Sequence, residues 1–116
     1  MTHYNTTIEL IEQLNRGPVD FNTTMQTIEN EYIFHPCEFK NGQIINTENT
    51  NNGSCKIFAF GQLNGLSPQA TLNAFGRFYT EDVLKHPDHK DHLNIRNFME
   101  FGWEGIHFEN TALTLK

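Results

Sequence analysis

Cysteine is scarce in this chain, because its 116 residues include only Cys37 and Cys55. Two cysteines so far apart form neither a CxxC redox motif nor the spacing of a zinc site. An export signal is also missing: the stretch MTHYNTTIELIEQL, at the start of the chain, has no basic segment and no unbroken apolar run. We therefore expect a cytoplasmic protein whose thiols stay reduced.

Positive charge is scarce as well. Eight Lys and Arg residues stand against fourteen Asp and Glu residues, which gives a formal net charge of -6 and a pI near 5.4. A surface of this sign repels the phosphates of nucleic acids and anionic lipids. No apolar run approaches the roughly 18 residues that a membrane-spanning helix needs. Neither nucleic acid nor a membrane is therefore an expected partner.

Signatures of catalysis and cofactor binding are missing too. The chain contains no GxGxxG, P-loop, GxSxG or HExxH motif, and we expect no cofactor. Cys55 is a candidate nucleophile, since the start of a helix lowers the pKa of a thiol. The apolar run SCKIFAFGQL around it favours the alternative, a buried and inert thiol.

The sequence is rich in phenylalanine, with ten Phe residues against three Tyr and one Trp. Phe has no polar group to satisfy, so these rings are expected to form the hydrophobic core. At this length the chain makes one domain over residues 1–116, with no room for a second core.

The N-terminal part has the periodicity of two helices. The first is predicted over residues 6–15 and ends at Gly17-Pro18. Asp20 caps the second, which ends at His35-Pro36 because the residue before a proline leaves the helical region. Their predicted buried stripes are Ile8, Ile11 and Leu14 in the first helix, and Phe21, Met25, Ile28 and Tyr32 in the second.

The next segment, CEFKNGQII, predicts a β-hairpin. Asn41-Gly42 lies between Phe39 and Ile44-Ile45, and both turn residues tolerate a positive φ. A two-stranded ribbon is only marginally stable by itself, so we expect its apolar face to pack on the helices. Residues 46–53, NTENTNNG, contain no apolar side chain and are predicted to form a loop.

Two more helices follow the loop. Residues 54–64 are apolar on nearly every side, which is typical of a central buried helix, although so short a run also fits a strand. Gly65 ends this helix, and Ser67-Pro68 starts the next one, which continues through Tyr79. Within that helix, Gly76 lacks a side chain and would let another helix approach closely.

The last helix is predicted over residues 91–100, with Ile95, Phe98 and Met99 buried. The segment IHFENTALTL, which follows Gly105, predicts a closing strand. Together these elements predict an α+β fold that is mainly helical, a compact single domain of five to six short helices with one β-hairpin.

The stretch HPDHKDHLNIRN, residues 86–97, has two interpretations. A zinc ion needs three or four converging ligands, and His86, His89 and His92 recur every three residues. Pro87 indicates a turn instead of a helix, and Lys90 opposes a divalent metal. We favour a turn that leads into the last helix, with His89 in a left-handed position.

In the favoured interpretation this stretch anchors the last helix. Asp91 is the predicted N-cap, whose carboxylate would accept the first free N–H groups. Arg96 lies one residue from the buried stripe, so it needs an acidic partner. The partner is expected among Asp82, Asp88 and Glu81.

Several stretches of the chain resemble the HopJ type III effector family of bacteria. They are NNGSCKIFAFGQLNGLS, TLNAFGRFYTEDVLKHP, DHLNIRNFMEFGWEGIHF and the final ALTLK. The pattern HP-x-G-x-DH-x-NIRNF is typical of the family, and His89 stands where the family has Gly. This difference supports a positive φ at His89 and leaves His86 and His92 as the metal ligands to test.

The resemblance implies a bacterial protein for which the family supplies neither catalytic residues nor a cofactor. Members in plant pathogens are thought to enter host cells by type III secretion, and the polar, acid-free start MTHYNTT fits such a signal. Similar proteins in other bacteria imply a housekeeping role as the alternative.

Two functions stay open at this point. The favoured one is a non-enzymatic interaction module that binds an unidentified protein partner in the bacterium or in a host. The alternative is a small metal-dependent enzyme or metal-binding protein that uses His86 and His92 in a cleft beside the Trp103 segment. The candidate binding residues are His86, Asp91, His92, Asn94, Arg96, Asn97 and Trp103.

Overall fold

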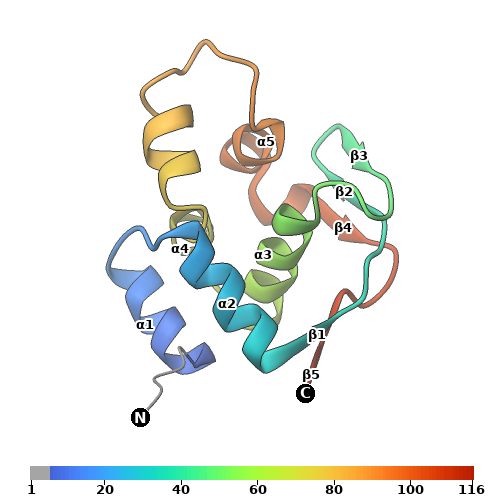
Figure 1. The fold of residues 1–116 in the computed structure, drawn as a ribbon. Helices are drawn as coiled ribbons and strands as arrows, with labels where there is room; N and C mark the ends of the chain where they lie inside the picture. The colour runs from blue at the N-terminus through green and yellow to red at the C-terminus, as the bar shows by residue number, and fades with distance from the viewer. Residues whose placement is uncertain (1–5) are drawn as a thin grey trace.

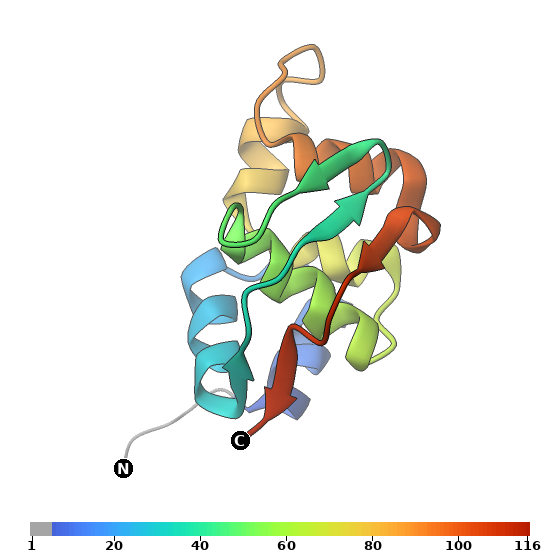
Figure 2. The same cartoon turned by 90° about the vertical axis from the view of Figure 1, so that its right-hand side faces the viewer.

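Helix α3 runs through the middle of the molecule, with α1, α2 and α4 on one side and the strands on another (Figure 1, Figure 2). The computed structural model describes residues 6–116. Its helices are α1 Thr7–Arg16, α2 Phe21–Glu31, α3 Asn52–Leu63, α4 Pro68–Asn73, the π-helix η1 Phe78–Val83, α5 Leu93–Phe101 and the 3₁₀-helix η2 Gly102–Gly105. Its strands are β1 Tyr32–Phe34, β2 Phe39–Asn41, β3 Ile44–Asn46, β4 Ile106–Phe108 and β5 Leu113–Leu115.

The predicted fold class, α+β and mainly helical, is confirmed. No helix within residues 6–116 has the length and apolar character needed to cross a membrane. The first five residues of the stretch MTHYNTT, which fits a secretion signal, lie outside the described residues.

Helix α1 forms where the sequence predicts it, but it buries a different face. It begins at a capping box, in which Thr6 and Glu9 exchange hydrogen bonds. Leu10 and Leu14, one turn apart, are fully buried. The prediction for Ile8 is wrong, since this residue is 73% exposed. The reason is that α1 packs on both α2 and α4, and their contacts lie on the side of Leu10 and Leu14.

Helix α2 starts as predicted and ends earlier than predicted. The Asp20 carboxylate accepts a hydrogen bond from the Asn22 N–H at 3.1 Å, which confirms the N-cap. The helix stops at Glu31, and Tyr32–Phe34 form a strand that pairs antiparallel with Leu113–Leu115. Pairing with a segment far along the chain therefore overrides the local helical period.

The hairpin is confirmed, with its turn shifted by one residue. Asn41 pairs with Ile44, so the turn residues are Gly42, at φ +61°, and Gln43. Asn41 is instead fully buried in β2. The third strand of this sheet is β4, which pairs with β2 on its other edge. As expected, the buried face of the hairpin packs on the helices.

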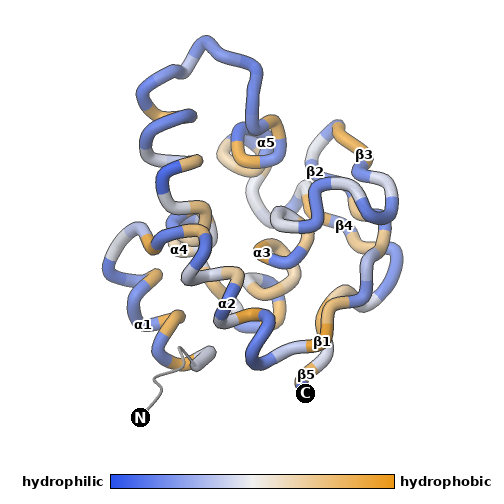
Figure 3. Tube along the Cα trace, viewed as in Figure 1, coloured by the Kyte–Doolittle hydropathy of each residue, from blue (hydrophilic) through white to orange (hydrophobic). Residues whose placement is uncertain are grey.

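Phe58 on α3 is the centre of the core. It is fully buried, and its ring centroid lies 4.9 Å from that of Phe98, 5.6 Å from Phe75 and 6.1 Å from Phe39. These contacts join α3 to α5, to the end of α4 and to the hairpin, so the predicted central, buried helix is confirmed. Figure 3 shows the contrast with the projecting loop after η1, which is hydrophilic along nearly its whole length.

The helix predicted from Ser67 through Tyr79 is broken at Gly76. Gly76 has a φ of +57°, and a Cβ there would lie 2.7 Å from the carbonyl oxygen of Val19. The close neighbour is therefore the connection between α1 and α2, not another helix as predicted. After this break the chain continues as η1, in which the Leu84 N–H donates to the Tyr79 carbonyl at 2.9 Å, five residues back.

We predict that Gly76→Ala destabilises the protein much more than Gly65→Ala. Both glycines have a left-handed φ, which costs about 1–2 kcal/mol for a residue with a Cβ. Only Gly76 faces a backbone, because nothing lies within 4 Å of a Cβ built at Gly65. Urea unfolding should show at least about 2 kcal/mol of additional loss for Gly76→Ala. Equal losses for the two variants would contradict the steric argument.

Candidate functional site

An open groove lies between the first turns of α3 and α5, and we call it the α3–α5 groove. Its volume is about 500 Å³. One part of its wall is apolar and consists of Phe21, Ile44, Phe75, Phe78, Leu93 and Ile95. The other part is polar and consists of Asn46, Asn51, Gly53, Ser54, Lys90, His92 and Asn94. Such a combination of an apolar wall and a few polar groups is typical of a binding site.

The two α-helices that begin at the groove differ from the other α-helices in their N-caps. Asn51 precedes α3 with a φ of +53°, and His92 precedes α5 with a φ of +50°. Neither side chain accepts a hydrogen bond from its helix. In contrast, side-chain caps close α1, α2 and α4. The first N–H groups of α3 and α5 therefore lack a side-chain acceptor of this kind.

Four asparagines, of which Asn41, Asn46 and Asn94 are buried, hold the two helix starts and the hairpin together. The Asn94 and Asn46 amides bond to each other in both directions, at 2.9 and 3.0 Å. Nδ2 of Asn41 donates to the Asn94 carbonyl at 2.8 Å, and Nδ2 of Asn51 donates to Oδ1 of Asn46 at 2.8 Å. We call these four residues the asparagine cluster. It joins β2, β3, the start of α3 and the start of α5 beneath the groove.

His92 is fixed at the rim of the groove by η1. Its Nε2 lies 3.1 Å from a carboxylate oxygen of Asp82, and its ring lies 5.2 Å from that of Phe78. Both partners belong to η1, the segment that follows the break at Gly76. The π-helix therefore sets the positions of an aromatic wall residue and of the carboxylate that holds the imidazole.

Arg96 has a structural role, as expected, but its partner differs from the expectation. Its Nη2 donates to Oδ1 of Asp91 at 2.7 Å, and its Nε donates to the Asp91 carbonyl at 2.6 Å. Further bonds of 3.4 Å reach the carbonyls of Pro87 and Asp82. Arg96 does not line the groove. Instead it ties the projecting loop to α5.

Two predictions about this loop are wrong. Asp91 is not the N-cap of α5, because its carboxylate binds Arg96 and His92 occupies the cap position. The left-handed residue is His92, not His89. Both errors have one cause: the helix starts at Leu93, two residues later than predicted, so the tight turn falls on His92.

The hydrogen bond from Arg96 holds the pKa of the Asp91 carboxyl below its usual value. Because the folded-state pKa is lowered, this pair stabilises the loop above the ordinary carboxyl range. The contribution is lost as the pH falls through the lowered pKa.

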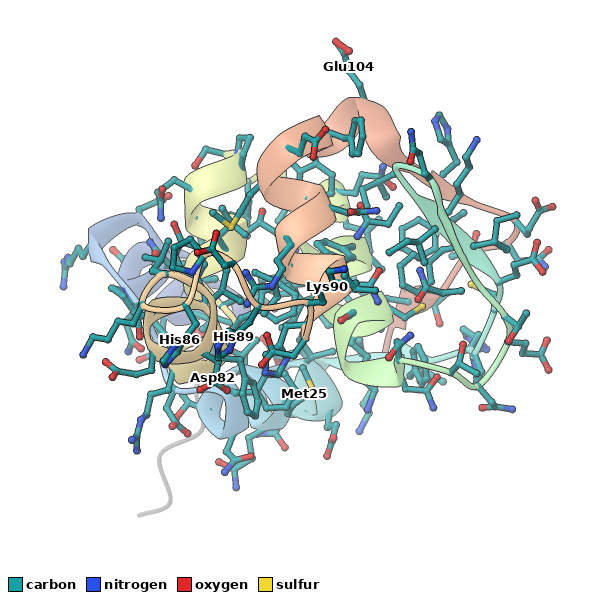
Figure 4. The ribbon with its side chains drawn as sticks, turned by 90° about the horizontal axis from the view of Figure 1, so that it is seen from above. Met25, Asp82, His86, His89, Lys90 and Glu104 are labelled. Carbon is teal, nitrogen blue, oxygen red and sulfur yellow. The ribbon has the colours of Figure 1, made fainter. Side chains whose placement is uncertain are left out.

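The histidines of the loop do not converge on one point. His86 and His89 are exposed and stack on each other with ring centroids 4.5 Å apart, whereas His92 binds Asp82. Figure 4 shows His86 and His89 over η1, and Lys90 lines the groove. No group of three or more His, Cys, Asp or Glu side chains within residues 6–116 could hold a metal ion. The positions of His86 and His92 therefore do not support the metal-dependent alternative.

The other candidate residues have positions away from the groove wall. Nδ2 of Asn97 donates to the Asn41 carbonyl at 2.9 Å, which supports the hairpin from α5. Nε1 of Trp103 donates to the Leu66 carbonyl at 2.8 Å, and the ring packs against Phe98. Neither Asn97 nor Trp103 lines the α3–α5 groove.

Sequence reasoning missed most of the groove. Asn46, Asn51, Gly53 and Ser54 come from the segment expected to be a plain loop or the start of a helix. Their signal was the run NTENTNNGS itself, because Asn is the residue after Gly that most readily adopts a positive φ. Asn49 and Asn51 both do so. No local pattern predicted Phe78, because its position in the groove wall depends on the break in the helix at Gly76.

Cys55 is buried in the first turns of α3, and Cys37 is its neighbour. Burial raises the pKa of the Cys55 thiol to about 12, and the Cys37 thiol adds to this effect. The interpretation as an inert thiol is therefore favoured over the interpretation as a nucleophile.

We predict that Arg96→Lys loosens the loop over residues 85–92. Lys keeps the charge but cannot form the forked bonds to Asp91, so amide hydrogen exchange in the loop should quicken by about tenfold or more. The same exchange experiment at acid pH should show a smaller further loss in the variant than in the wild type. Arg77→Lys, at an exposed position, is the matched control. If the loop amides of Arg96→Lys exchange as slowly as those of the wild type, Arg96 does not hold the loop in place.

We also predict that native protein resists alkylation at both cysteines. Iodoacetamide at pH 8 should modify neither thiol in the folded state and both in urea, because both thiols are buried and the raised pKa of Cys55 leaves almost no thiolate there. Leu63→Cys, at the exposed end of the same helix, should react in the folded state. Rapid alkylation of Cys55 in the folded protein would instead support the interpretation of Cys55 as a nucleophile.

Comparison with known proteins identifies relatives of the whole chain. The crystal structure of the unknown-function protein VPA0580 superposes with a TM-score of 0.91 at 57% sequence identity, and the match covers 94% of this chain and 92% of that one. No curated protein matches the chain. The family model described as HopJ type III effector protein matches residues 7–113. The chain therefore belongs to the HopJ type III effector protein family.

Proposed function

We propose that this HopJ family member is a non-enzymatic protein-interaction module and that it binds its partner in the α3–α5 groove. The observation that carries the proposal is the coincidence of the apolar groove with strained backbone. The left-handed residues Asn51 and His92 both lie in its wall, and so does Phe78 of the π-helix. Strained backbone costs stability and collects at functional sites, where the surrounding structure maintains it.

The exposed parts of the apolar wall support the same proposal. Phe78 is 39% exposed and Leu93 is 50% exposed, and both line the groove. Burying apolar surface against a partner contributes about 25 cal/mol per Å². Aromatic side chains set in such a pocket are often the residues that dominate binding energy. Phe78 is therefore the residue on which we expect affinity to depend most.

The family supports an effector role, in which the partner is a host protein reached through type III secretion. A partner inside the bacterium fits the groove equally well. The α3–α5 groove has the same role in both cases, so the identity of the partner decides between them.

A site-specific crosslinking experiment tests the proposal. A photo-crosslinking residue at Leu93 should give one defined adduct with a protein from the bacterium or a host extract. The same residue at Leu63, which is 58% exposed at the far end of α3, should not give that adduct. The captured protein is then identified by mass spectrometry and purified.

The purified partner should bind Phe78→Ala about tenfold or more weakly than the wild type, and Leu63→Ala with unchanged affinity. Thermal unfolding of both variants provides the folding control, because Phe78 also packs on Phe21 at 5.1 Å. The proposal fails if the adducts at Leu93 and Leu63 are the same, or if a folded Phe78→Ala binds normally.

A further inference from the structure

We infer that the α3–α5 groove receives the C-terminal residue of a partner chain, with an apolar side chain against the wall and its free carboxylate beside Lys90. This inference rests on the proposed function and names the chemistry of the bound segment.

The groove is free of acidic residues among its described lining, in a chain whose formal net charge is -6. Its ionisable lining residues are Lys90 and His92. The surrounding surface therefore disfavours an anion almost everywhere, whereas this wall offers a cation and no competing carboxylate. A ligand with one negative charge complements such a wall.

Two acids next to groove residues, Asp82 and Asp91, already have partners. The Asp82 carboxylate bonds to His92 at 3.1 Å, and the Asp91 carboxylate bonds to Arg96 at 2.7 Å. Lys90, by contrast, forms no ion pair with any residue of the described chain, while Lys56 and Lys85 each have one. The ammonium group of Lys90 is thus available to a ligand.

Backbone polarity adds to the attraction of this edge. The first turns of α3 and α5, helices of 12 and 9 residues, both meet the groove without a side-chain cap. Their N–H groups and helix dipoles favour a negative group in the groove that Lys90 also lines. Gly53, in the first turn of α3, lets the Phe21 ring lie directly against the backbone, since a Cβ at this position would lie 2.8 Å from the ring.

The closeness of the two walls favours a chain end over an internal acidic residue. Phe21 borders Gly53 directly, so a carboxylate and an apolar side chain must be bound within a short distance of each other. At a chain end both groups are attached to one Cα. An internal Asp or Glu would carry its charge on a separate side chain, and a strongly acidic segment would be repelled by the rest of the surface.

The test uses N-acetyl-leucine and N-acetyl-phenylalanine, together with their C-terminal amides, as probes in an NMR titration of the full chain. The acids should shift the backbone signals of Gly53, Ser54, Leu93 and Asn94, and they should bind about fivefold or more tightly than the amides. The advantage of the acids should shrink as salt is added.

Two substitutions test whether Lys90 is the cation that binds the ligand carboxylate. Lys90→Gln should remove most of the difference between acid and amide without changing the binding of the amide. Lys85→Gln, whose partner is Glu81 outside the groove, should leave both affinities unchanged. Both positions are exposed, so neither variant threatens the fold.

The possible outcomes separate this inference from the proposed function. If acid and amide bind equally well at the groove, the groove does not recognise a carboxylate. The proposal that it binds a protein would still stand. If 4-methylpentanoate binds as tightly as N-acetyl-leucine, the ligand is a small carboxylic acid and not the end of a peptide chain. No shift at the groove with any probe overturns the inference, and loss of the Leu93 adduct in crosslinking overturns the proposed function as well.

Discussion

The buried amide of Asn94 is the constraint on which the rest of this structure depends. It is only 8% exposed, and through Asn41 and Asn46 it fixes the start of α5 to both strands of the hairpin. Buried amides are costly unless they are bonded, so a network of this kind permits few other arrangements. The cluster therefore specifies how the hairpin and α5 meet.

The position of α5 in turn determines the geometry of the loop before it. The loop projects from the molecule after η1 and must return to a helix whose first turn is already held by Asn94 (Figure 1). His92 makes this return with a left-handed φ, and Arg96 holds the preceding residues through Asp91. Strain at one residue is thus offset by bonds on either side of it.

Local signals in the sequence predicted what local physics controls. Asp20, Ser67 and Pro68 lie at the helix starts that they predicted, because a cap and its helix are adjacent in the chain. The failures have non-local causes. Tyr32–Phe34 continue a helical period and yet pair with the last strand, and Asn41 leaves the predicted turn because it bonds to α5.

The same distinction explains why the groove could not be predicted. Its apolar wall combines Phe21, Ile44 and Phe75 with residues near the start of α5, and these segments, far apart in the sequence, meet only in the folded chain. The charged residues of the stretch HPDHKDHLNIRN have separate roles, which spacing alone does not show. Arg96 and Asp91 are used within the fold, while Lys90 and His92 face the groove.

This division has a physical basis in the helix start. Lys90 and His92, which precede the first residue of α5, line the groove, whereas Arg96, one turn into α5, bonds back to Asp91 in the loop. A shift of the helix start changes the side to which each following side chain points, because successive residues are about 100° apart on a helix. The late start of α5 at Leu93 therefore decides which charges stabilise the loop and which remain available at the groove.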